Sequence, residues 1–128
     1  KKAVKTVNRE YDVILLDCPP TISSLSESVF KAADHIVVPV IPSTLSVRTF
    51  EQLVDFFRKQ NLGMKKLIPF FSMVQRQKTL HTDTMSQLRN RYAKTFLDTS
   101  IPFSTDVEKM GIHRQFLGDA IFLHCHRR

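Results

Sequence analysis

An aspartate that directly follows an apolar run is the first residue of this chain whose type and position could do chemistry. Asp17 comes after the apolar residues 13–16 and before Cys18-Pro19-Pro20. At the C-terminal end of a buried parallel strand, such a carboxylate could help to hold Mg²⁺ through water beside a nucleotide phosphate, because a hard cation prefers oxygen ligands. An aspartate that only begins a turn would give the same pattern, which by itself is weak.

Cysteine and histidine supply the other reactive side chains. Cys18 and Cys125 lie far apart, and the N-terminal residues lack the apolar stretch of a signal peptide, so we expect two free thiols. The triplet His-Cys-His at 124–126 has no second ligand cluster, and we expect no metal site there. No Ser-His-Asp or Cys-His arrangement has a motif context. An independently active hydrolase is therefore the least favoured class.

Basic residues concentrate in one part of the chain. The net charge is +7, and residues 65–94 contain seven Lys or Arg against one Asp. A local excess of this kind favours a polyanion such as DNA as a partner, although a solvated helix face would carry the same residues. The candidates for phosphate contacts are Arg76, Lys78, Arg89, Arg91 and Lys94.

Strand-type segments must position these residues. Residues 11–17 and 34–40 are short apolar runs typical of strands that are buried on both faces of a parallel sheet. Residues 67–74 predict a third strand, whose early proline suits an edge position or a strand start. Residues 96–102 are a candidate for a short fourth strand.

Helix signals follow the strands. An amphipathic pattern predicts a helix over residues 45–60, which the sequence Asn-Leu-Gly at 61–63 ends. Another helix is expected to open at residue 82. Capping-box spacing after Thr105 predicts a last, brief helix that Gly111 halts.

The alternation of strands and helices indicates an α/β fold. We expect a three-layer structure with a mostly parallel sheet and right-handed crossovers, formed by residues 1–128 as one partial domain. Apolar residues make up 42% of the chain and charged residues 24%, which allows a core and excludes a disordered class. No window approaches the ~20 apolar residues of a membrane span, so a cytoplasmic protein is expected.

Several motifs occur in the order of a known family. Residues 11–20, Tyr-Asp-Val-Ile-Leu-Leu-Asp-Cys-Pro-Pro, resemble the D-x-P-P segment of the ParA/MinD family, deviant-Walker P-loop ATPases of plasmid and chromosome partition. The chain also resembles the family's next strand, its following loop and helix, a later strand, and its nucleotide-base loop, at residues 33–40, 42–53, 69–74 and 101–111. The resemblance spans roughly residues 9–117.

The resemblance implies roles for individual residues. Asp17 would be the magnesium-side carboxylate, acting through water, and Pro19 and Pro20 would belong to the switch loop that senses the γ-phosphate. Pro102, Phe103 and Ser104 would lie near the adenine of ATP or ADP, with Phe103 offering a ring face to the base. An ordinary core phenylalanine is an equally good account of Phe103, and Asp106 is expected to be only a first-turn helix charge.

The chain also departs from the family. No G-x-x-x-x-G-K-[ST] segment or lysine-bearing variant occurs, and the three glycines, Gly63, Gly111 and Gly118, are isolated. Without that loop there is no nest of backbone amides for the phosphates. In the family these elements precede the segment present here, so we expect an incomplete fold that lacks the first strand and the P-loop helix. Residues 120–128 also fail to continue the expected C-terminal helix.

Two functions remain open from the sequence. The first is a ParA/MinD-like partitioning ATPase fragment that is inactive alone, whose full-length relatives would bind ATP with Mg²⁺, non-specific DNA and a ParB-like activator. The second is a non-catalytic interaction module, since a sheet that lacks a strand exposes an apolar edge and invites homodimerisation or domain swapping.

Overall fold

The computed structural model describes residues 11–18, 24–93 and 95–113 of the 128-residue chain. Four α-helices, one 3₁₀ turn and three strands follow one another in these ranges. Their order is α2 (Ser24–Ala32), β1 (Ile36–Val40), α3 (Thr44–Lys59), η1 (Met64–Lys66), β2 (Leu67–Val74), α4 (Thr79–Arg91), β3 (Ser100–Pro102) and α5 (Thr105–His113).

The three strands form a parallel sheet in the order β1-β2-β3. A helix connects each strand to the next, as a parallel arrangement requires. The pairing of β1 with β2 is regular from Ile36, opposite Leu67, to Val40, opposite Phe71. The structure therefore confirms the α/β class with an incomplete parallel sheet.

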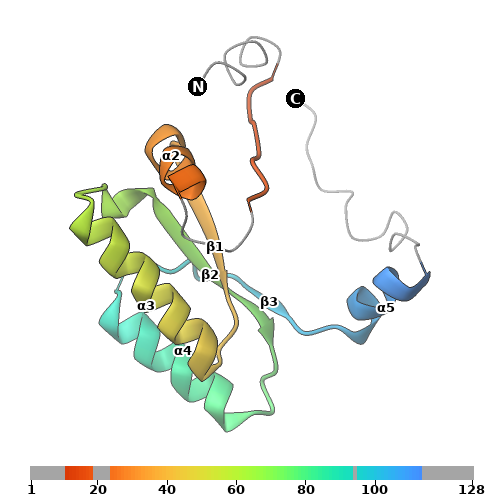
Figure 1. The fold of residues 1–128 in the computed structure, drawn as a ribbon. Coiled ribbons are helices and arrows are strands. Elements are labelled where there is room, and N and C mark those ends of the chain that lie inside the picture. Colours follow the sequence, from red (N-terminus) through yellow and green to blue (C-terminus); the bar gives the residue numbers. More distant parts are fainter. Residues whose placement is uncertain (1–10, 19–23, 94, 114–128) are drawn as a thin grey trace.

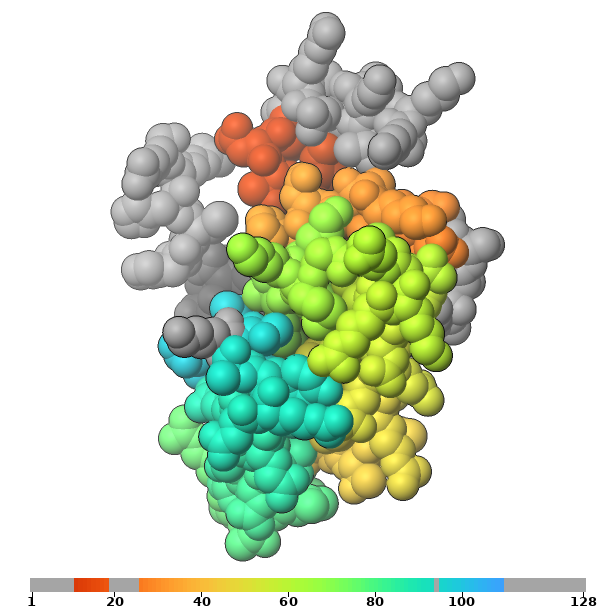
Figure 2. All heavy atoms as spheres, turned by 90° about the vertical axis from the view of Figure 1, so that its left-hand side faces the viewer, coloured from red at the N-terminus to blue at the C-terminus, as the bar shows by residue number. Residues whose placement is uncertain are grey.

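Helices α3 and α4 lie side by side on one face of the sheet (Figure 1). The strands alternate accordingly, because successive side chains point to opposite faces. Along β1, Val40 is buried toward the helices, whereas Val37 and Pro39 are exposed on the other side. Seen from the helical side, α3 and α4 form one continuous surface over the sheet (Figure 2).

Aromatic rings fill the space between this helical layer and the sheet. Phe57 of α3 and Phe71 of β2 are fully buried. Phe71 stacks on Phe96, with ring centroids 4.5 Å apart, and Phe50 meets the edge of Phe96 at 5.2 Å. Offset and edge-to-face contacts of this kind add to the stabilisation from burial. The core thus links α3 to the central strand and to the segment after α4.

The ends of α3 have identifiable causes. Ser43 caps the N-terminus by accepting a hydrogen bond from the Ser46 amide at 3.5 Å. At the C-terminus Asn61 has φ 52°, and the Leu62 amide donates to the Phe57 carbonyl at 2.9 Å. This is the Schellman arrangement, in which a left-handed residue ends the helix. The sequence prediction of a stop at residues 61–63 is confirmed.

Three sequence predictions about elements were wrong. Residues 11–17 do not form a strand of the sheet: residues 11–18 are extended but carry no strand pairing, and Leu15 is 87% exposed. Apolar character alone cannot make a strand where the described chain offers no neighbour to pair with. Helix α4 begins at Thr79 rather than at residue 82, and α5 continues past Gly111 to His113. A single glycine weakens a helix without necessarily ending it.

The sequence predicted no segment that could span a membrane. None of the helices in the described ranges is both long enough and apolar enough to cross a bilayer.

Val54→Ala tests the core between α3 and the sheet. Val54 is fully buried, so we expect this truncation to lower the free energy of unfolding by about 2 kcal/mol. Leu45→Ala on the same helix is the matched control: Leu45 is 77% exposed, and its loss should change stability by less than about 0.5 kcal/mol. Urea unfolding followed by circular dichroism measures both, and equal effects of the two variants would contradict the packing described.

Candidate functional site

The C-terminal edge of the sheet is where a parallel arrangement gathers its loops. Because β1, β2 and β3 run in the same direction, the loops that follow them leave the sheet at one edge. These loops are residues 41–43, 75–78 and 103–104. Ligands of open α/β sheets bind beyond this edge. The candidate site is therefore built from these three loops.

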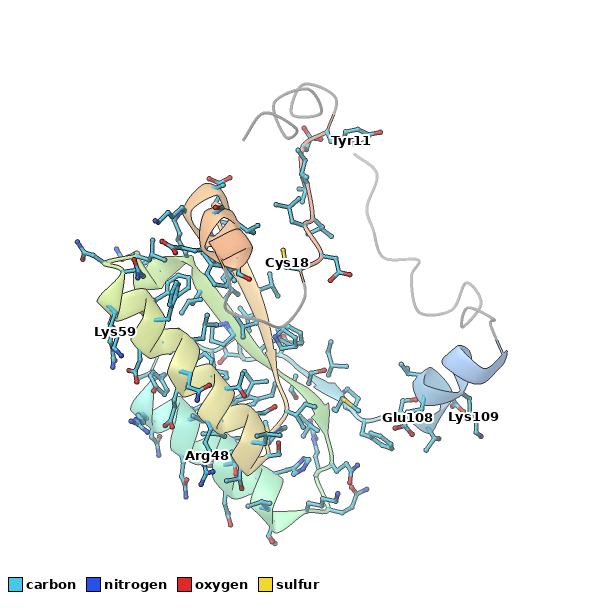
Figure 3. All side chains as sticks on the ribbon, in the orientation of Figure 1. Tyr11, Cys18, Arg48, Lys59, Glu108 and Lys109 are labelled. Carbon is cyan, nitrogen blue, oxygen red and sulfur yellow. The ribbon has the colours of Figure 1, made fainter. Side chains whose placement is uncertain are left out.

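Asp17 does not join this edge in the described structure. The carboxylate is exposed and lies next to the last residue of the extended segment 11–18, which is not paired with any strand of the sheet. Figure 3 shows Tyr11 and Cys18 at the two ends of this segment, both away from α3. Cys18 is a free, exposed thiol among the described residues, and Cys125, the other cysteine of the sequence, lies outside them. Pro19 and Pro20, the other two switch-loop candidates, lie outside the described residues.

The base-side candidates do belong to the edge. The Phe103 amide donates to the Val74 carbonyl at 3.0 Å, which fixes the loop after β3 to the end of β2. Phe103 and Ser104 are half-buried and Pro102 is exposed. Among the described residues Phe103 stands outside the buried core cluster, and it is partly exposed at this edge. Asp106 is exposed in the first turn of α5, which agrees with a helix charge.

The end of β2 is irregular in a way that the sequence did not reveal. The pairing with β3 shifts between Phe71 and Val74, so that Phe71 lies opposite Ser100 and Val74 opposite Pro102. Within this bulge Met73 has φ 54°, a left-handed conformation that is uncommon for a residue with a side chain. Bulges re-aim the chain at the ends of strands. This one directs the loop 75–78 away from the ladder.

The side chain of His81 binds the first residue of that loop. The sequence did not predict this contact. The Gln75 amide donates to Nδ1 of His81 at 3.2 Å, and the histidine is only 7% exposed. This contact fastens the start of the loop 75–78 to the first turn of α4. A single histidine within a helical pattern gave no signal for this role, since the contact depends on where the loop returns.

The five basic residues that the sequence offers as contacts for DNA phosphates do not all lie in one place in the structure. Arg76 and Lys78 are exposed in the loop after β2, at the C-terminal edge of the sheet. Arg89 and Arg91 lie in the last turn of α4, which has 13 residues and so extends for about 20 Å. The two pairs therefore lie at opposite ends of the helix. Lys94 lies outside the described residues.

Arg89 and Arg91 are also engaged within the chain. Arg89 donates to the Asp98 carbonyl at 2.8 Å, and its guanidinium lies 5.6 Å from the centre of the Phe71 ring. Arg91 forms an ion pair with Glu51 of α3 and lies over the ring of Tyr92. These contacts give both arginines a structural role that Arg76 and Lys78 do not show in the described part of the chain.

A hollow near this end of α4 is lined by Arg89, Tyr92, Phe96 and Asp98. Because α4 returns the chain to the start of β3, the hollow lies toward the N-terminal edge of the sheet. That is the edge opposite the candidate site. Within the described ranges there is no group of three or more His, Cys, Asp or Glu side chains arranged to hold a metal ion.

The sequence is similar to known proteins over most of its length. Residues 1–70 match the family model described as an AAA domain. The chain is 30% identical over 95 residues to a ParA family protein of Mycoplasma pneumoniae, an alignment that covers 71% of this chain and 34% of that protein.

Two further relatives are named for partition and sporulation. The chain is 23% identical over 117 residues to the sporulation initiation inhibitor protein Soj of Bacillus subtilis, and 22% identical over 117 residues to the chromosome-partitioning ATPase Soj of Treponema pallidum. Each alignment covers 88% of this chain and 46% of the relative. The chain therefore spans less than half the length of these curated relatives.

His81→Ala tests the histidine contact at the site edge. We expect a loss of about 1–3 kcal/mol in the free energy of unfolding, because the Gln75 amide loses its acceptor. His81→Asn is the matched variant: its side-chain oxygen can accept the same amide hydrogen, and it should recover part of the loss. Chemical denaturation of the three proteins measures this, and equal stability of the alanine and asparagine variants would argue against the hydrogen bond.

Proposed function

The chain belongs to the ParA/MinD-like family of ATPases, and we propose that it forms the part of a partitioning ATPase that contributes Asp17 and the base-side loop to an ATP site. The order of the motifs carries this proposal. A D-x-P-P segment, a parallel sheet, and the loop 102–104 occur in the family's order, and the loop is tied by Phe103 to the end of the central strand. Pro19 and Pro20 would act as the switch next to Asp17.

The residues of this chain do not fit a whole nucleotide. Gly63 is followed by the 3₁₀ turn η1 rather than by a phosphate-binding helix, Gly111 lies within α5, and no G-x-x-x-x-G-K-[ST] segment occurs among the 128 residues. Backbone amides in a nest and a lysine are what hold the phosphates of ATP in P-loop enzymes. We therefore derive no hydrolytic step for this chain. A nucleotide with Mg²⁺ would need groups outside these 128 residues to bind its phosphates.

DNA binding is the second part of the proposal. Arg76 and Lys78 are exposed on one loop, beside the exposed Gln77, and they have the charge to contact backbone phosphates without reading sequence. Arg89 and Arg91 support such contacts less well, because intramolecular partners already engage both guanidinium groups. A ParB-like activator, which the family resemblance implies, is part of the same proposal.

A non-catalytic interaction module is the alternative function, and one observation favours it. Apolar side chains of the extended segment 11–18 and of β1 are exposed, among them Tyr11, Leu15 and Val37. Exposed apolar surface next to an unpaired strand marks a protein interaction site more often than a catalytic one.

Nucleotide turnover tests the first part of the proposal. The 128-residue chain should show no phosphate release above background with ATP and Mg²⁺, because it has no amide cradle for the β- and γ-phosphates. A malachite-green assay measures this, with Asp17→Ala as the matched variant. Turnover by the unmodified chain that Asp17→Ala abolishes would show that a complete site exists and would overturn the proposal.

A salt titration tests DNA binding. Fluorescence anisotropy with random duplex DNA should show an affinity that falls linearly with salt on logarithmic axes. The double variant Arg76→Ala/Lys78→Ala should reduce the slope by about 2, since two phosphate contacts are lost. Arg91→Ala, which removes an ion-paired guanidinium, is the control and should leave the slope nearly unchanged. The DNA proposal fails if the unmodified chain shows no salt-sensitive binding.

A further inference from the structure

One peptide group at the end of β2 is hydrogen-bonded on both sides. Its carbonyl oxygen, on Val74, accepts the Phe103 amide hydrogen at 3.0 Å. Its amide, on Gln75, donates to Nδ1 of His81 at 3.2 Å. In a trans peptide group the carbonyl and the amide point in opposite directions. This peptide group therefore lies between the loop 102–104 on one side and the first turn of α4 on the other.

A side chain serves this amide where no strand does. The strand β1 ends at Val40, opposite Phe71, so none of the strands of the described sheet reaches the Gln75 amide on that side. An amide hydrogen that is removed from water without a partner is costly. His81, which is only 7% exposed, supplies the acceptor from the first turn of α4.

The loop 75–78 is a closed turn behind this amide, where β2 passes into α4 (Figure 1). The Lys78 amide donates to the Gln75 carbonyl at 3.1 Å, which is the hydrogen bond of a β-turn with Arg76 and Gln77 at its centre. The Lys78 carbonyl in turn accepts the His81 amide hydrogen at 3.0 Å. Both ends of the turn are thus fixed, while the side chains of Arg76 and Lys78 are exposed.

We propose that His81 is a positioning residue: it fixes the place of Arg76 and Lys78 through the Gln75 amide, and it couples the turn 75–78 to the loop 102–104 through the same peptide group. The part that concerns the two basic side chains rests on the proposed binding of DNA phosphates. A turn that is fixed before binding loses less conformational freedom on binding. Because the peptide group is planar and rigid, its rotation would displace the carbonyl oxygen and the amide hydrogen together.

Two substitutions separate the acceptor of His81 from its bulk. His81→Asn places a carbonyl oxygen the same number of bonds from the backbone as Nδ1 and keeps an acceptor. His81→Leu keeps a branched side chain that suits a buried position, but it offers no acceptor. If His81 only filled space, the leucine variant would resemble the unmodified chain more closely than the asparagine variant. Should His81→Leu not fold, His81→Gln, whose carbonyl oxygen lies one bond too far out, replaces it.

Amide hydrogen exchange, measured by nuclear magnetic resonance without DNA, tests the coupling. We expect His81→Leu to speed exchange at the Gln75 amide by about fivefold, since one hydrogen bond is lost. Exchange at the Phe103 amide, on the far side of the peptide group, should rise in the same variant. The Leu62 amide, which donates to the Phe57 carbonyl at 2.9 Å at the end of α3, is the control and should be unchanged. His81→Asn should keep both rates near those of the unmodified chain.

Binding of random duplex DNA tests the positioning of the two basic side chains. In a salt titration followed by fluorescence anisotropy, His81→Leu should weaken binding by about fivefold at each salt concentration, because the turn must then be ordered on binding. The slope against salt should stay as in the unmodified chain, since both charges remain. Arg76→Ala/Lys78→Ala, by contrast, should lower the slope. His81→Asn should bind DNA as the unmodified chain does.

Three results would contradict this inference. One is an unchanged exchange rate at Gln75 in the leucine variant, and another is a faster rate at Gln75 with no change at Phe103. The third is DNA binding that His81→Asn weakens as much as His81→Leu. Absence of salt-sensitive binding by the unmodified chain would refute the proposed DNA contacts, whereas failure of the exchange experiment with binding intact would refute the positioning role alone.

Discussion

The pairing of β2 on both of its edges is the constraint on which the described structure depends. Strand β2 joins β1 and β3, and Phe71 in its middle is fully buried against Phe96. Because all three strands are parallel, their C-terminal ends come to one edge, and the hydrogen bond from Phe103 to Val74 fastens the last loop there. The position of every loop at the candidate site follows from this central strand and its aromatic contacts.

The candidate site that results lies at the C-terminal edge of the sheet. The loop 102–104 and the basic loop 75–78 meet this edge, and the second of these loops lies between the bulge at Met73 and the buried His81. Asp17 has the chemistry for magnesium but is separate from this edge. The separation has a simple cause, since a carboxylate is positioned only as well as the strand that carries it. In this chain that segment has no partner in the described sheet.

The distribution of basic residues shows how much tertiary contacts change the meaning of a charge cluster. In sequence, Arg76 to Lys94 form one basic stretch with a single acidic residue. In space the described members divide between the two ends of α4, and the pair at the far end is used for contacts with Glu51, Asp98 and two aromatic rings. A short sequence distance along a helix is a long distance between charges, because each residue adds about 1.5 Å.

The sequence by itself determined the elements that depend on local interactions. The strand β2 was predicted at residues 67–74 as observed, and α3 was predicted within one residue at each end, because its cap, its apolar stripe and its left-handed stop at Asn61 are all local signals. Only the tertiary structure decided whether residues 11–17 pair, how Gln75 meets His81, and which of the candidate arginines have partners within the chain, since each contact depends on how the chain turns between one element and the next. An apolar run specifies that a segment tends to be buried, but hydrogen-bonded pairing needs a second strand, and a pattern of residues cannot supply it.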